Sequence, residues 1–316
     1  MKKYISLLIK IAITVAIFYF MLKDQDFNKF ADLYSKSDGL ILFASSILIL
    51  LSIFILSFRW NRINKIFQFK FPQIELYKHY LIAYGFNSFL PSAIGGDIWR
   101  IRFLTKQTGR KIDSVVSPFL ERITGMIAIL CVLPLAFNEF GQYIEQDQVT
   151  SFVYLTVFLL LLLFFGLFTQ FGQNVLLFVI NKMTNDSWIK KLTSLKETLL
   201  LIHSNRIRMI EGIVLSIITQ FIFTLSCWAS FYAFGGSIAF MDFYLVIIIM
   251  YIATTLPISL NGFGPREATI IWGLTHFGIE KELAIVVALF ISFLTLVPSF
   301  VGGAVFLLSK EELKNV

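Results

Sequence analysis

Apolar residues follow one another in long runs along this chain. A helix needs about 20 consecutive apolar residues to cross the hydrocarbon core of a bilayer. The run 115–137 qualifies only if Glu121 and Arg122 are tolerated within the membrane. Six runs predict an all-α, polytopic integral membrane protein with about six full transmembrane helices: 4–22, 40–58, 115–137, 151–168, 210–234 and 283–308. The first run is too long for the apolar part of a cleaved signal peptide, so we expect it to be a membrane anchor.

Two further apolar segments, 74–96 and 244–274, are interrupted in the middle by proline and glycine. Lysine and arginine in short loops mark the cytoplasmic side of a membrane protein. Basic clusters lie on both sides of the first segment, so a single crossing would place one of them on the wrong side. We therefore predict that each segment is a re-entrant helical hairpin. The predicted bends contain Pro91, Gly95 and Gly96 in the first hairpin, and Pro257, Gly262, Gly264 and Pro265 in the second.

The charge pattern also predicts a topology with both termini in the cytoplasm, and with the loops 23–39, 235–239 and 278–282 outside. Each half of the chain then contains two transmembrane spans, a hairpin and a further span, in that order. The first half starts in the cytoplasm and the second half starts outside. This order predicts a single membrane domain, 1–316, built from an inverted repeat of 1–140 and 150–316. Paired Gly/Pro-broken segments in two halves point to a transport site. The alternative is that glycine and proline are simply more frequent in membrane helices.

The composition supports the prediction of a membrane protein, and the absence of known catalytic motifs limits the kinds of active site to be expected. Hydrophobic residues make up 57% of the 316 residues and charged residues only 15%, whereas soluble domains carry about 25% charged residues. The sequence contains no Walker A loop, dinucleotide fingerprint, hydrolase elbow or zinc-protease motif. Its histidines have no further ligands at metal-binding spacing. We therefore expect no enzymatic activity, no cofactor, no metal and no nucleic-acid partner.

Charged residues inside apolar segments are the first functional candidates, because an ion in the membrane is costly and usually faces a cavity or a partner. Asp97 and Arg100 would share one face of a helix that starts near Gly96, and Asp97 could also cap that start. Glu121 is a candidate for neutralising an arginine of a hairpin, and Arg122 for binding phosphate. The alternatives are an N-cap with an interfacial arginine for the first pair, and an interfacial position for the second.

The stretch "NGFGPRE", 261–267, is the most specific signal in the sequence. Proline suits the first turn of a helix, so a helix is expected over 266–276. Its positive N-terminal end, free N–H groups and Arg266 would together make an anion site suited to phosphate, with Asn261 as a further binding candidate. Glu267 would favour the helix dipole and serve as the counter-ion of Arg266 in the empty site. A purely structural salt bridge is the alternative.

These motifs resemble a known family. The blocks "FLPSAIGGDIWRIRFL" and "LPISLNGFGPREATIIWGL", with "SFRWNR" and "PFLERITGMIAIL", resemble the lysylphosphatidylglycerol synthase transmembrane-region family, also called the flippase-like domain family. Larger members of that family carry a soluble aminoacyltransferase domain, and we expect the present chain to match only their membrane part, without synthase activity. By position, the resemblance assigns the family's charged motif residues to Arg59, Asp97, Arg100, Glu121, Arg122, Arg266 and Glu267.

The resemblance and the charges together predict a flippase-like transporter in the cytoplasmic membrane. Its substrate would be an anionic, phosphate-bearing lipid such as an aminoacyl-phospholipid or a polyprenyl-phosphate sugar. Its partners would be membrane lipids and possibly a lipid-modifying enzyme. Two alternatives stay open: a secondary transporter of a small soluble anion, and a non-catalytic membrane scaffold for a lipid-modifying enzyme.

Overall fold

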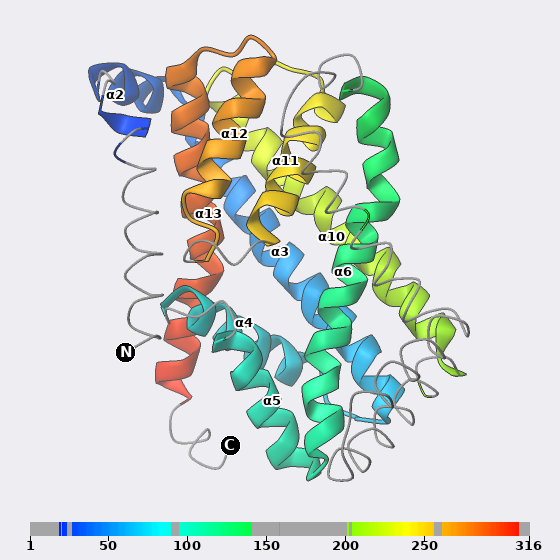
Figure 1. Cartoon of the computed structure of the whole chain (residues 1–316). Coiled ribbons are helices and arrows are strands. Elements are labelled where there is room, and N and C mark those ends of the chain that lie inside the picture. The colour runs from blue at the N-terminus through cyan, green and yellow to red at the C-terminus, as the bar shows by residue number, and fades with distance from the viewer. Residues whose placement is uncertain are drawn as a thin grey trace, which may run out of the picture. The chain divides into compact units, whose positions relative to one another are not determined.

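The computed structural model describes residues 27–89, 95–140, 204–255 and 261–309, together with a few isolated positions before and between these ranges. The described residues form helices joined by short turns, with no strand among them (Figure 1). The helices are α2 (Phe27–Lys36), α3 (Gly39–Asn64), the short 3₁₀ helix η1 (Lys65–Phe67), α4 (Gln73–Phe89), α5 (Gly95–Thr108), α6 (Lys111–Phe140), α10 (Arg206–Ala233), α11 (Phe240–Thr255), α12 (Pro265–His276) and α13 (Lys281–Leu308). This confirms the prediction of an all-α architecture for the described part of the chain.

Within the described ranges, four helices are long and apolar enough to cross a membrane: Gly39–Phe67, Lys111–Val132, Arg206–Ala233 and Lys281–Leu308. They coincide with four of the expected spans, 40–58, 115–137, 210–234 and 283–308. The expected spans 4–22 and 151–168 lie almost entirely outside the described residues. The protein is therefore a multi-pass membrane protein.

The chain divides into two compact units. Unit 1 comprises 1–55, 77–100 and 218–316, and unit 2 comprises 56–76 and 101–217. In unit 1, apolar side chains of α10, α11, α12 and α13 form a buried core that includes Phe231, Phe243, Ile270 and Ile285. In unit 2, Trp60, Phe71 and Phe103 pack ring against ring where α3 ends and α5 continues.

The first broken segment folds as two antiparallel helices, α4 and α5. The amide N–H of Gly96 donates to Asn87 Oδ1 at 2.7 Å, and Trp99 Nε1 donates to His79 Nδ1 at 3.1 Å. A Cβ atom at Gly96 would collide with the carbonyl of Ala83, so the start of α5 lies directly against the end of α4. Gly95 and Gly96 begin α5, while Pro91 lies outside the described residues.

The second broken segment also folds as two antiparallel helices, α11 and α12, and α12 packs between α11 and α13 (Figure 1). A Cβ at Gly273 would stand 2.8 Å from both methyl groups of Val246, which shows how closely α12 approaches α11. The expected helix start is confirmed, since Pro265 is the first residue of α12. Pro257 lies outside the described residues.

Loops that the charge pattern places outside the membrane contact one another in unit 1. Lys29 of α2 forms an ion pair of 2.7 Å with Glu282 in the first turn of α13. The amide of Asp38 donates to the carbonyl of Ala233, 3.0 Å away at the end of α10. Asp38 also caps α3, because its carboxylate accepts bonds from the amides of Leu40 and Ile41. These contacts are those expected if the loops 23–39, 235–239 and 278–282 share one side.

Glycine permits the closest approach between α4 and α13. A Cβ at Gly302 would overlap the backbone carbonyl of Leu81, and a Cβ at Gly85 would stand 3.2 Å from the amide of Gly303. Small residues allow membrane helices to pack backbone against backbone in this way. The fit of α4 on α13 therefore depends on these positions having no side chain.

Replacing Gly302 by alanine is expected to destabilise the protein by about 1–3 kcal/mol, since overpacking forces the backbone apart. Gly39→Ala is the matched control, because nothing lies within 4 Å of its added methyl group, and its effect should stay within about 0.5 kcal/mol. Unfolding of both variants in the same detergent measures the difference. Equal stability of the two variants would contradict the close approach.

Candidate functional site

Among the described residues, the buried arginine and carboxylate side chains of the apolar helices fall into three groups. The Arg266 cluster comprises Asn261, Arg266, Glu267, Ser292 and Thr295, and the Asp97–Arg100 pair lies at the start of α5; both belong to unit 1. The Arg59 cluster comprises Arg59, Glu121 and Ser216 and belongs to unit 2.

The turn before α12 has a backbone that few residues adopt. Asn261, Gly262 and Gly264 have positive φ angles of 49°, 80° and 93°. Glycine tolerates this conformation without steric cost, and asparagine is among the few other residues that adopt it readily. Pro265 follows as the first helical residue, where its missing N–H is not needed. The sequence "NGFGP" therefore sets the tight entry that turns the side chain of Arg266 toward α13.

Arg266 is buried and is held by neutral groups. It is 9% exposed. Its Nη1 donates to Thr295 Oγ1 at 2.8 Å and its Nη2 donates to the carbonyl of Asn261 at 3.1 Å. The guanidinium carbon also lies 5.3 Å from the ring centroid of Phe263. These two bonds use two of the five N–H groups that a guanidinium offers.

Glu267 forms no direct ion pair with Arg266 among the described residues, although its charge still favours the charged guanidinium. Its carboxylate accepts a bond from the amide of Gly264 at 2.5 Å and another from the hydroxyl of Ser292 on α13. The side chain is fully buried. Neighbouring residues of a helix point about 100° apart, so the two charges face different partners. Glu267 instead closes the start of α12 and ties it to α13.

The backbone N–H groups expected to be free at the start of α12 are partly occupied. The amide of Gly264 is bound by Glu267, and the amide of Arg266 donates to the carbonyl of Gly262 at 3.0 Å. Among the described residues, no carboxylate forms an ion pair with Arg266. A buried cation that has no direct ion pair is costly, and an anion bonded to it would lower that cost. The anion-binding capacity of this site therefore lies in the guanidinium rather than in the helix end.

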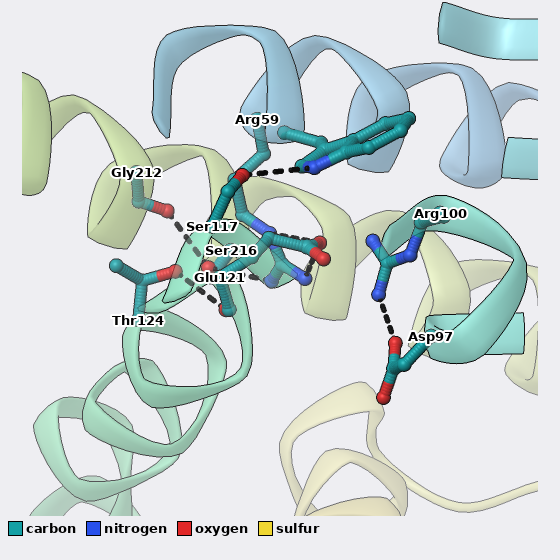
Figure 2. A network of polar contacts seen from close by, with 9 residues as sticks. Arg59, Asp97, Arg100, Ser117, Glu121, Thr124, Gly212 and Ser216 are labelled. Atoms are coloured by element: carbon teal, nitrogen blue, oxygen red, sulfur yellow. Dashed lines mark hydrogen bonds and ion pairs between the residues drawn. The ribbon is translucent and has the colours of Figure 1, made fainter. Parts of the chain in front are cut away.

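The Asp97–Arg100 pair forms as the spacing of three residues predicts. Asp97 and Arg100 are joined by a buried ion pair (Figure 2). The guanidinium carbon of Arg100 also stands 4.9 Å from the centre of the Tyr80 ring on α4. The charge of Arg100 is therefore neutralised by Asp97 in the first turns of α5.

The Arg59 cluster joins three of the long helices within unit 2. Arg59 of α3 donates from Nε to Glu121 Oε1 of α6 at 3.0 Å, forms an ion pair with the same oxygen through Nη2, and donates from Nη1 to Ser216 Oγ of α10 at 2.8 Å (Figure 2). Arg59 is 8% exposed and Glu121 is 1% exposed. Arg122, the next residue of α6, is exposed, as the helical angle between neighbours requires.

Several hydroxyl groups at these sites were not predicted from the sequence. Ser292 and Thr295 hold Glu267 and Arg266 from α13, and Ser216 holds Arg59. A signal was present, because Ser292, Thr295 and Ser299 recur at helical spacing within an otherwise apolar helix. Hydroxyls at i, i+3 and i+7 share one face; Ser292 and Thr295 contact the second broken segment, and Ser299 contacts the first.

Comparison with known proteins identifies the family of the chain. The chain is similar to the UPF0104 membrane protein PH1989 of Pyrococcus horikoshii, with 21% identity over 333 aligned residues that cover 98% of either chain. The model of the family described as the lysylphosphatidylglycerol synthase TM region matches residues 7–303. This match includes every residue of the three polar groups described above. The chain therefore belongs to the family of lysylphosphatidylglycerol synthase TM regions.

Proposed function

We propose that this protein is a flippase-like transporter that moves an anionic, phosphate-bearing lipid headgroup across the membrane. The family is named after the membrane region of a lipid synthase, which supports a role connected with membrane lipids. The observation that carries the proposal is Arg266, a buried guanidinium held by neutral partners in an apolar helical core. Phosphate is a fitting ligand for such a group, since it accepts two parallel N–H bonds and would be a directly bonded ionic partner.

The two helix pairs support a site in the middle of the membrane. The 16 residues of α11 and the 12 residues of α12 span about 24 Å and about 18 Å, less than the hydrocarbon core of about 30 Å. We therefore infer that α11–α12 and α4–α5 are re-entrant hairpins of an inverted repeat. If α11 enters the membrane from the outer surface and α12 returns to it, Arg266 at the start of α12 would lie near the bilayer midplane, where transport sites of inverted repeats lie.

In the proposed mechanism the headgroup passes through a polar path beside the hairpins while the lipid tail stays in the bilayer. An ionised headgroup faces a large desolvation barrier in hydrocarbon. Arg266 lowers this barrier by replacing water around the phosphate. Within the same unit, the paired Arg100 offers a further positive group, and its carboxylate partner Asp97 holds it in place.

The test is transport by the purified full-length protein in phospholipid vesicles. Fluorescent analogues of phosphatidylglycerol, phosphatidylcholine and an uncharged glycosylated diacylglycerol are followed by quenching of the outer leaflet, and radiolabelled phosphate uptake is measured beside them. We expect faster movement of the anionic lipid than of the other two, without uptake of free phosphate. Phosphate uptake alone would favour a soluble-anion transporter. No acceleration over protein-free vesicles for any anionic lipid tested would overturn the proposal.

A further inference from the structure

Asn261 makes two contacts at once, one with each broken segment. Its backbone carbonyl accepts the bond from Arg266 Nη2 at 3.1 Å, within the second segment. Its side-chain amide donates to the hydroxyl of Ser88, 3.0 Å away near the end of α4 in the first segment. One residue therefore joins the anion-binding group to the opposite hairpin.

Ser88 is itself held in place by the helices around it. Its hydroxyl lies 2.7 Å from the hydroxyl of Ser299 on α13, and Ser299 also donates to the carbonyl of Tyr84 at 3.3 Å. The preceding residue, Asn87, accepts the amide of Gly96 at the start of α5. Any movement of the Asn261 side chain would thus reach the end of α4 and, through its neighbour, the start of α5.

The backbone of this turn does not by itself require asparagine. The φ angle of 49° at Asn261 is one that glycine adopts freely, and glycine already occupies two of the next three positions. Glycine would leave the carbonyl that Arg266 contacts in place. What asparagine adds is the amide that reaches Ser88, so its side chain has a role beyond shaping the turn.

We propose that Asn261 is a positioning residue that couples headgroup binding at Arg266 to the first hairpin; this inference rests on the proposed function. An incoming phosphate forms charge-assisted bonds, which are stronger than the bond between Arg266 and the neutral carbonyl of Asn261. In the proposed step the phosphate replaces this carbonyl at Nη2, and the resulting change in the turn at Asn261 reaches the end of α4 through the bond to Ser88. This coupling would affect the rate of transport, whereas the affinity for the headgroup would depend on Arg266.

The experiment separates binding from transport in Asn261→Gly, Ser88→Ala and the double variant. Both single variants should lower kcat for phosphatidylglycerol transport about 5-fold, the effect of one lost hydrogen bond, with KM unchanged. The double variant should be no slower than Ser88→Ala, because Ser88→Ala already lacks the contact with Asn261. Ser35→Ala, at an exposed position on α2, is the matched control and should transport at the normal rate.

A second readout does not depend on transport. Short-chain phosphatidylglycerol should raise the Tm of the wild type and of Asn261→Gly equally, while hydrogen exchange of residues 84–89 should respond to this lipid only in the wild type. An equal exchange response in both proteins, or a raised KM with normal kcat, would overturn the coupling. If the wild type is neither stabilised by nor transports any anionic lipid, the proposed function itself fails.

Discussion

Arg266→Gln is expected to lower the affinity for an anionic headgroup by about 10- to 150-fold and to reduce lipid transport accordingly. The substitution removes the charge but keeps an amide that can reach Thr295 or the carbonyl of Asn261, so the turn and α12 should remain folded. A hydrogen bond to a charged group contributes about 1.5–3 kcal/mol, and each 1.4 kcal/mol corresponds to about tenfold in affinity. Stabilisation by phosphatidylglycerol and transport in vesicles measure the two effects.

Arg102→Gln is the matched control for Arg266→Gln, because it removes the same charge from an exposed position on α5. Its transport should equal that of the wild type. Arg266→Lys should recover part of the activity, since lysine restores the charge without the fork of donors that a phosphate matches. Equal transport by wild type and Arg266→Gln, with both proteins folded, would remove Arg266 from the site.

Glu121→Ala is expected to have the largest effect on stability. It leaves the buried guanidinium of Arg59 without the carboxylate it is paired with, and breaking a buried ion pair costs about 3–5 kcal/mol. Unfolding of the purified protein in detergent measures the loss. Glu211→Ala is the matched control, because Glu211 and Arg62 form a longer, partly exposed pair of 3.7 Å, and such pairs contribute about 0–1 kcal/mol.

Combining Arg59→Leu with Glu121→Leu tests the reason for that loss. Replacing both partners of a buried pair by apolar residues is often neutral or stabilising, so the double variant should be more stable than Glu121→Ala. If this restored protein transports lipid normally, the Arg59 cluster is structural. If stability returns and transport does not, the pair acts in the transport cycle.

The long helices could be predicted from the sequence, but their ends could not. An apolar run marks the crossing of the hydrocarbon, whereas the helix continues into the polar interface; α3 therefore extends to Asn64 and α6 begins at Lys111, beyond the runs 40–58 and 115–137. The helix α2 was missed because it lies in a polar loop and becomes stable by packing Phe30 against the core. The break of each interrupted segment into two helices was predictable, because Gly and Pro break an apolar helix in a recognisable way.

The position of the candidate site was also predictable, while its contacts were not. "NGFGPRE" identified the helix start and the charged residues. Spacing alone could not show that Glu267 turns away from Arg266, because its partner Ser292 lies 25 residues later in the sequence. The link between Asn261 and Ser88 joins residues 173 positions apart and depends on how two hairpins meet. Such long-range contacts follow from packing, which local patterns do not specify.

The shortness of α11 and α12 also affects the bilayer in the proposed arrangement. The 16 residues of α11 are about 24 Å long. This apolar length is shorter than the hydrocarbon thickness of the surrounding bilayer, about 30 Å. A bilayer adapts to such a hydrophobic mismatch by becoming thinner around the protein. The protein would then compress the bilayer beside the place where a headgroup crosses, so that acyl-chain length, as well as headgroup chemistry, sets how fast lipids move.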